Sequence, residues 1–174
     1  TPPAFDRRTE DVGNLVELGH LNVRVPDQQL AIVFYVMGLG LTRDPYQRTG
    51  VDNAWINVGN SQFHLPVGPA QLLRGVTGLV MPDLDALMLR LQQVRHHLKG
   101  TAFTFVRHGA QVDVICPWGN RLRAHAPDTV RFGPMRLGMP YVEIDAGPGT
   151  SAGIARFYGD LLAAVSACGQ DERG

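Results

Sequence analysis

The sequence predicts an α+β fold: two βαβββ modules with helices outside mainly antiparallel sheets, and an incomplete third module at the end. Three observations predict it. Val25-Pro26-Asp27 recurs 56 positions later as Met81-Pro82-Asp83, and Gly59-Asn60 recurs 60 positions later as Gly119-Asn120. Apolar and polar residues alternate before each Pro-Asp pair, which is typical of half-buried strands. An apolar stripe at helical spacing follows each pair, so one strand-helix-strands unit is used twice.

The repeat divides the 174-residue chain into four parts. Residues 1–14 are polar and contain proline, and we expect a loose leader there. Residues 15–70 are expected to form the first module and residues 71–130 the second. Residues 138–174 offer only one strand and one helix, which is the first half of a third module.

The first module begins with residues 18–25, a strictly alternating strand. One of its faces is apolar, with Leu21, Val23 and Val25; the other is polar, with His20, Asn22 and Arg24.

A helix over residues 28–37 follows this strand, with Asp27 as a favourable N-cap and a stop at Gly38. Three extended segments come next, residues 41–46, 53–58 and 61–66, the last two joined by the tight Gly59-Asn60 turn.

The second module repeats this order. Residues 75–81 form its first strand, and Asp83 caps a helix over residues 84–98 that carries a single apolar stripe. Gly100 ends the helix. Three further strands are predicted over residues 102–106, 111–115 and 121–126.

The third segment contains a strand over residues 141–145 and a helix over residues 151–164. The helix presents an apolar stripe that has no partner within its own module: Ile154, Phe157, Tyr158, Leu161 and Leu162. Such a stripe and an open sheet edge need a cover. We therefore expect that the chain is a fragment, or that this half module packs on the rest of the chain or on a second chain in a homo-oligomer.

The composition excludes some functions. The formal net charge is zero, which argues against nucleic acid as a partner. No apolar run reaches the length of about 18 residues that a membrane span needs. The two cysteines are far apart and match no metal-site spacing, so reduced thiols and a cytoplasmic location are the default expectation.

The two modules resemble the vicinal oxygen chelate superfamily, which includes glyoxalase I, extradiol dioxygenases, epimerases and the bleomycin and fosfomycin resistance proteins. The resemblance covers roughly residues 17–127. It rests on the segment from Leu18 to Asp27, on Phe34-Tyr35 before Gly38-Leu39-Gly40, on Gln62-Phe63-His64-Leu65, and on the turn Cys116-Pro117-Trp118-Gly119-Asn120. The last resembles the family's Asp-Pro-x-Gly-Asn turn, with Cys in place of Asp. The resemblance implies a curved sheet around a cleft, while the reaction stays open.

The resemblance also implies a metal held by the first and last strands of each module. In the first module these positions carry His20 and His64, and imidazoles suit divalent transition metals such as Zn, Fe, Mn or Ni. In the second module they carry Val76 and Arg123, which do not coordinate. His125 lies two residues on, on the same strand face as Arg123, so a set of His20, His64 and His125 would need an unusual register. A protein without metal is the other reading.

The candidate ligand-binding residues are Asn22, Arg24, Gln62, Arg121 and Arg123. A guanidinium at position 123 suits bidentate binding of a carboxylate or phosphate. The alternative is that these side chains are solvated strand residues that bind no ligand. Trp55 is expected to lie in the core or to cover a turn.

The sequence therefore leaves two functions open, both with a small polar or anionic molecule bound in a cleft between modules. One is a metal-dependent lyase, isomerase or dioxygenase of glyoxalase-like type. The other is a binding protein of the sequestering or resistance type that has no metal. No catalytic residue follows from the sequence.

Overall fold

The computed structural model describes residues 17–47 and 53–169. The expected leader over residues 1–14 lies outside this part. The segment Leu18–Ile144 forms one compact unit, and the rest of the described chain belongs to a second unit. No helix among the described residues is long and apolar enough to cross a membrane.

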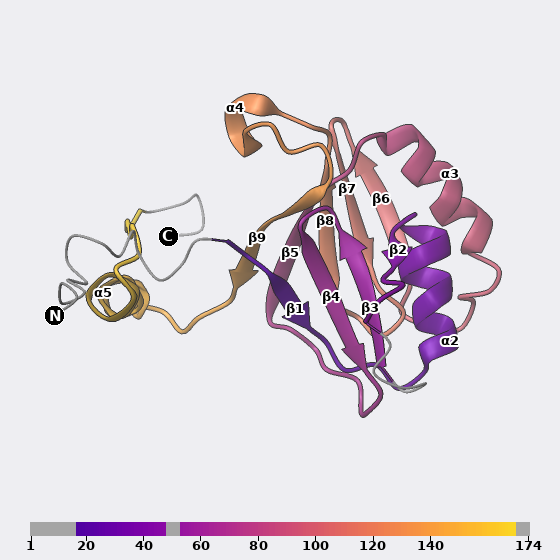
Figure 1. Cartoon of the computed structure of the whole chain (residues 1–174), viewed down its shortest axis with the longest axis horizontal. Helices are drawn as coiled ribbons and strands as arrows, with labels where there is room; N and C mark the ends of the chain where they lie inside the picture. Colours follow the sequence, from indigo (N-terminus) through magenta and orange to yellow (C-terminus); the bar gives the residue numbers. More distant parts are fainter. Residues whose placement is uncertain (1–16, 48–52, 170–174) are drawn as a thin grey trace, which may run out of the picture. The chain divides into compact units, whose positions relative to one another are not determined.

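The first module follows the predicted order (Figure 1). Its elements are β1 (His20–Asn22), α2 (Gln28–Ala31), η1 (Ile32–Gly38), β2 (Thr42–Arg43), β3 (Asn53–Val58) and β4 (Ser61–Pro66). The side chain of Asp27 caps α2 by accepting from the amides of Gln29 and Leu30. The single predicted helix widens into the π-helical segment η1, where the Leu39 amide donates to the Phe34 carbonyl, five residues back, at 2.9 Å.

The second module has the same order. Its elements are β5 (Gly75–Val80), α3 (Leu84–Val94), β6 (Thr104–His108), β7 (Gln111–Ile115) and β8 (Arg121–His125). Asp83 caps α3 in the way that Asp27 caps α2. The regular helix ends four residues before the predicted end and continues as turns.

A short helix that the sequence did not predict, α4 (Thr129–Phe132), leads to β9 (Gly138–Ile144). It is capped by Asp128, whose side chain accepts from two backbone amides. The last helix, α5 (Ser151–Leu162), lies in the second unit.

The strands form two sheets, with the orders β1-β4-β3-β2 and β6-β7-β8-β5-β9. The first and last strands of each module pair in parallel, and all other pairs in the sheets are antiparallel. In each module a helical segment and two strands lie between the first and last strands in the sequence, yet these two strands are neighbours in the sheet. The predicted α+β class with mainly antiparallel sheets and helices outside is confirmed, and Figure 1 shows α2 and α3 side by side along the two sheets.

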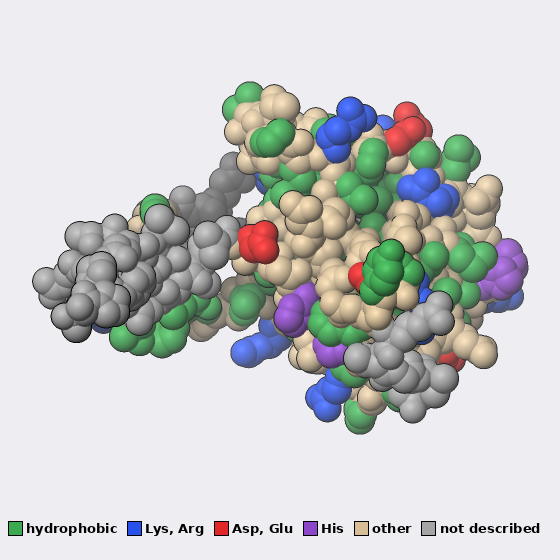
Figure 2. Space-filling model, in the orientation of Figure 1, with side chains coloured by type: hydrophobic (Ala, Val, Ile, Leu, Met, Phe, Trp, Pro, Cys, Tyr) green, Lys and Arg blue, Asp and Glu red, His purple; other side chains and the backbone are tan. Residues whose placement is uncertain are grey.

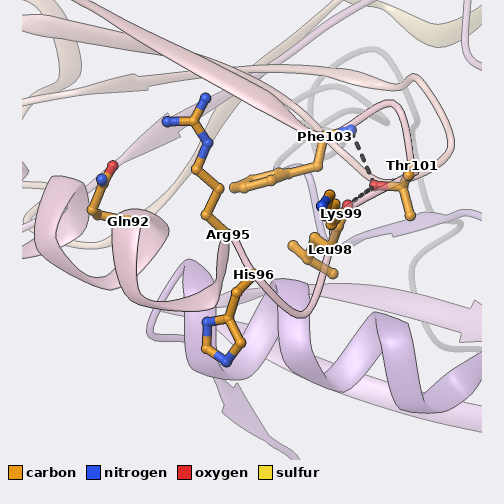
Figure 3. Close-up of a pocket in the computed structure, with 8 residues that line it drawn as sticks. Gln92, Arg95, His96, Leu98, Lys99, Thr101 and Phe103 are labelled. Atoms are coloured by element: carbon orange, nitrogen blue, oxygen red, sulfur yellow. Dashed lines mark hydrogen bonds between the residues drawn. The ribbon is translucent and has the colours of Figure 1, made fainter.

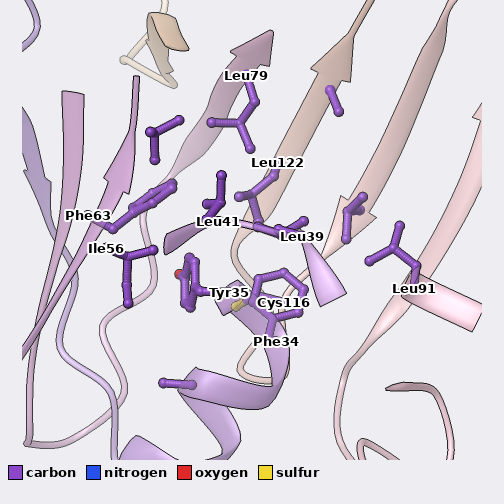
Figure 4. Close-up of a cluster of buried hydrophobic side chains, with 14 of the residues drawn as sticks. Phe34, Tyr35, Leu39, Leu41, Ile56, Phe63, Leu79, Leu91, Cys116 and Leu122 are labelled. Carbon is purple, nitrogen blue, oxygen red and sulfur yellow. The ribbon is translucent and has the colours of Figure 1, made fainter. Parts of the chain in front are cut away.

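One apolar core joins the modules. It contains side chains from both sheets, from η1 and from α3 (Figure 4). The ring of Tyr35 lies 4.9 Å from that of Phe63 in its own module, whereas Phe34 lies 5.8 Å from Phe103 in the other. Alternation fixes which strand residues enter this core, so the opposite face of each sheet carries the polar side chains.

Candidate functional site

The polar face of the first sheet brings His20 and His64 together from β1 and β4. Their ring centroids lie 6.3 Å apart. The indole of Trp55, on β3, stacks on the His64 ring at 4.0 Å and meets the His20 ring edge-on at 5.3 Å. Figure 2 shows histidine side chains at the surface beside hydrophobic ones over β1 and β4. Three rings thus form an aromatic cluster on this face, which we call the His20 cluster (His20, Trp55, His64).

Two ring nitrogens of the His20 cluster are buried without a hydrogen-bond partner among the described residues, Nε2 of His64 and Nε1 of Trp55. Burial lowers the pKa of His64, and the neighbouring His20 lowers it further. His64 is therefore neutral at pH 7, the form in which an imidazole binds a metal or accepts a hydrogen bond.

The predicted ligand-binding residues of this face differ in their hydrogen bonds within the protein and in their exposure to solvent. Gln62 donates both amide hydrogens within the protein, to Asp44 Oδ2 at 2.9 Å and Asn57 Oδ1 at 2.7 Å. The amides of Gln47 and Tyr46 donate to Asp44, which lowers the pKa of its carboxyl. Asn22 and Arg24 are exposed. Of this set, Asn22 and Arg24 have the most accessible side chains.

The residues present do not by themselves fit a metal centre. Two imidazoles bound to one ion through bonds of about 2.1 Å place their ring centroids roughly 5 Å apart at a tetrahedral angle, less than the 6.3 Å observed. No three His, Cys, Asp or Glu side chains of the described chain come together to hold a metal. His125 lies on β8 in the other sheet, and among the described residues it does not come together with His20 and His64 as a metal-ligand group.

The polar face of the second sheet contains a pocket of about 280 Å³ between β6, β7, β8 and β5. Two predicted ligand-binding residues, Arg121 and Arg123, line it. Its apolar lining includes Val76, at the position where the family resemblance implied a ligand, and Val106 and Ile115. Asp113 is the only carboxylate among the lining residues, so the pocket is cationic.

Arg123 is held in a polar network. Its Nε donates to Asp113 Oδ1 at 2.9 Å, and this bond raises the pKa of the guanidinium. Tyr141 lies close enough to interact electrostatically with Arg123, and its hydroxyl lies 2.8 Å from His125 Nε2. His125 is only 4% exposed, and burial lowers its pKa. His125 is therefore a buried neighbour of the Tyr141 hydroxyl.

The sequence did not single out Tyr141 or Asp113, although both hold Arg123. Tyr141 enters the site because β9 pairs with β5, and this pairing places Tyr141 opposite Gly78. Asp113 faces Arg123 in the register of β7 and β8. Alternation in β7 could have placed Asp113 on the polar face, whereas no local signal predicts the partner of β9. Trp55, expected to be core or turn cover, is half-buried on His64.

A second, larger pocket of about 440 Å³ lies where α3 ends and carries the basic side chains of Arg95, His96 and Lys99. Figure 3 shows Arg95 and His96 pointing in opposite directions. These cations do not converge on one ligand, so the pocket of Arg123 is the better candidate site.

No family model and no curated protein sequence matches the chain. Solved structures resemble it in fold. A glyoxalase/bleomycin resistance protein/dioxygenase family enzyme from Burkholderia phytofirmans is 11% identical, with 64% of this chain and 98% of that chain covered and a TM-score of 0.48. A fosfomycin resistance protein from Mesorhizobium loti is 11% identical, with 67% of this chain and 95% of that chain covered and a TM-score of 0.48. An antibiotic binding protein from a Streptomyces species is 27% identical, with 64% of this chain and 96% of that chain covered and a TM-score of 0.43.

The topology itself agrees with the resemblance drawn from the sequence. Each module runs strand, helix and three strands, and its first and last strands pair in parallel. The unit Leu18–Ile144 therefore has the paired βαβββ topology that the resemblance to the vicinal oxygen chelate superfamily implied.

Proposed function

We propose that this protein binds a small anionic molecule in the pocket on the polar face of the second sheet. The observation that carries the proposal is the position of Arg123, a guanidinium fixed by neighbours at the wall of a pocket of about 280 Å³. A guanidinium has five N–H donors, of which Nε–H serves Asp113. The NH₂ groups offer the fork geometry that a carboxylate or phosphate accepts.

The lining supports a ligand with a short apolar body. Val76, Val106 and Ile115 line the pocket beside the two arginines. Ligand pockets are usually apolar with a few placed polar groups that fix orientation. A small carboxylic acid, or a phosphate ester of similar size, matches this combination of one cationic wall and several aliphatic side chains.

The test is a titration of the purified chain with a panel of short aliphatic and aromatic carboxylates and with inorganic phosphate, followed by NMR shifts. The proposal expects binding that weakens about ten- to a hundred-fold in Arg123→Met, since a hydrogen bond to a charged group contributes about 1.5–3 kcal/mol. Arg95→Met is the matched control, because Arg95 lines the other pocket. A wild-type chain that binds no member of the panel, or equal losses in both variants, would refute the proposal.

A second candidate is the metal-dependent lyase, isomerase or dioxygenase. The observation that favours it is the Nε2 of His64, which lies beside His20 and is buried with no hydrogen-bond partner in the described part of the chain. Metal analysis of protein purified without chelator, compared with His64→Gln, distinguishes the candidates. Stoichiometric Zn, Fe, Mn or Ni that is lost in His64→Gln supports the enzyme reading, and metal-free protein that still binds an anion supports the first.

A further inference from the structure

The two sheets have four edge strands among the described residues, and β1 differs from the other three. Edge strands usually carry a charged residue or a proline that discourages pairing with another chain. β2 carries Arg43, β6 carries Arg107, and β9 carries Pro140 and Glu143. β1 has the sequence His-Leu-Asn. Its edge lacks these safeguards.

One side of the β1 backbone forms no strand pairing with any of the described residues. The Val23 amide donates to the His64 carbonyl, and the Val25 amide donates to the Pro66 carbonyl. Because backbone groups alternate along a strand, the amides of His20 and Asn22 point to the outer edge. Farther along, the Arg24 amide donates to Gln71 Oε1, and the Gln71 amide donates to the Arg24 carbonyl. The unused edge therefore covers about residues 18–22.

β5 and β9 are the first strands of the second module and of the incomplete third module, and they pair in an antiparallel manner. Val76, on the first strand of the second module, corresponds to His20 by the repeat of 56 positions. Glu143 corresponds to His20 by a repeat of 123 positions, because Phe34-Tyr35 of the first helix recurs 123 positions later as Phe157-Tyr158 of α5. The register places Val76 directly opposite Glu143.

The same antiparallel register, applied to two copies of β1, places His20 opposite His20 of a second copy. A register in which a residue faces its own counterpart is self-complementary, as a two-fold symmetric interface requires. We propose that β1 pairs with β1 of a second copy of this chain. The two four-stranded sheets then form one sheet of eight strands (4 + 4).

The consequence is a polar face that two copies share. Each copy contributes its His20 cluster beside the two-fold axis, so the imidazoles of His20 and His64 from both chains lie on one surface. A single chain supplies half of this surface. The inference is independent of the anion pocket, which lies on the other sheet.

The first test is the mass in solution by light scattering. The proposal expects about twice the 19.0 kDa of one chain. Asn22→Pro removes an outward amide but none of the amides that bond to β4, and proline is tolerated on edge strands. The variant is expected to be a monomer that still unfolds cooperatively. A wild-type monomer, or a folded Asn22→Pro dimer, would overturn the proposal.

The second test is disulfide crosslinking, which remains decisive even if Asn22→Pro fails to fold. Opposed residues of a hydrogen-bonded antiparallel pair have Cα atoms about 5.5 Å apart, within the disulfide range of about 4.4–6.8 Å. In a Cys168→Ser background, which removes the exposed thiol, His20→Cys should form a covalent dimer under mild oxidation. Arg43→Cys, on the opposite edge of the same sheet, should not. Equal crosslinking of the two variants, or none in either, would overturn the pairing.

Discussion

A glycine at position 78 makes room for the polar network of the second module. Gly78 lies directly opposite Tyr141, and a Cβ atom at position 78 would overlap the Tyr141 ring. The ring therefore lies against the backbone of β5, where its hydroxyl is 2.8 Å from His125 Nε2 and interacts electrostatically with Arg123. The repeat places Gly78 at the position of Asn22 in the first module, where none of the described strands pairs with the outer edge of β1.

We predict that Gly78→Ala destabilises the fold by about 1–3 kcal/mol, the usual effect of overpacking. Chemical denaturation measures the free energy of unfolding. Gly19→Ala is the control, since a Cβ there meets no atom within 4 Å. The double variant Gly78→Ala/Tyr141→Ala should lose less stability than the sum of the single variants, because the clash is removed. Simple additivity would contradict this account.

The buried His125 predicts a loss of stability in acid. Its pKa is lowered mainly by burial and by Arg131 and Arg123, against the opposing charges of Asp113 and Glu143. The unfolded chain, with a histidine pKa of about 6.5, then binds the proton more readily than the folded chain. Stability is therefore full above about pH 6.5 and falls as the pH drops towards the folded pKa.

Urea unfolding at pH 7.5 and pH 5.5 measures this effect. In His125→Gln the difference between the two pH values should shrink, because the titrating group is gone. His64→Gln should reduce it as well, since the pKa of His64 is also lowered by burial. A wild-type protein that is more stable at the lower pH would rule out the explanation.

At the scale of elements, the same Phe-Tyr pair is buried in one helix and exposed in another. Phe34-Tyr35 and Phe157-Tyr158 occupy equivalent places in helices that follow a first strand. Phe34 and Tyr35 are buried between the sheets, whereas Phe157 and Tyr158 are 53% and 40% exposed. The difference is that the first helix is followed by three strands of its own module, and α5 has none within the described chain.

We predict that α5 opens far more easily than α2 or α3. A helix of 12 residues without a packed face is marginal in water, and Ile154 and Leu161 add to its exposed apolar surface. Hydrogen exchange followed by mass spectrometry should show the amides of α5 exchanging well before those of α3. Equal protection of the two helices would show that the apolar stripe of α5 is covered in solution.

At the scale of the whole molecule, local sequence signals predicted the order of the helices and strands in the two modules. Alternation, the Asp27 and Asp83 caps and the repeated Gly-Asn turns are local signals, and both predicted βαβββ modules are present. These signals act over a few residues, so they can be read without knowing the partners. They also place Arg123 on the polar face of its strand.

The tertiary structure alone decided which polar faces meet and what holds their side chains. From the sequence, a set of His20, His64 and His125 would have needed an unusual register. The chain places His20 and His64 on one sheet and His125 on the other, where it bonds to Tyr141. That outcome depends on β9 pairing with the edge of β5, a contact between strands about sixty residues apart. Pairing at such a distance depends on which edges are free and which side chains fit across them, as Gly78 fits Tyr141, and no local pattern encodes it.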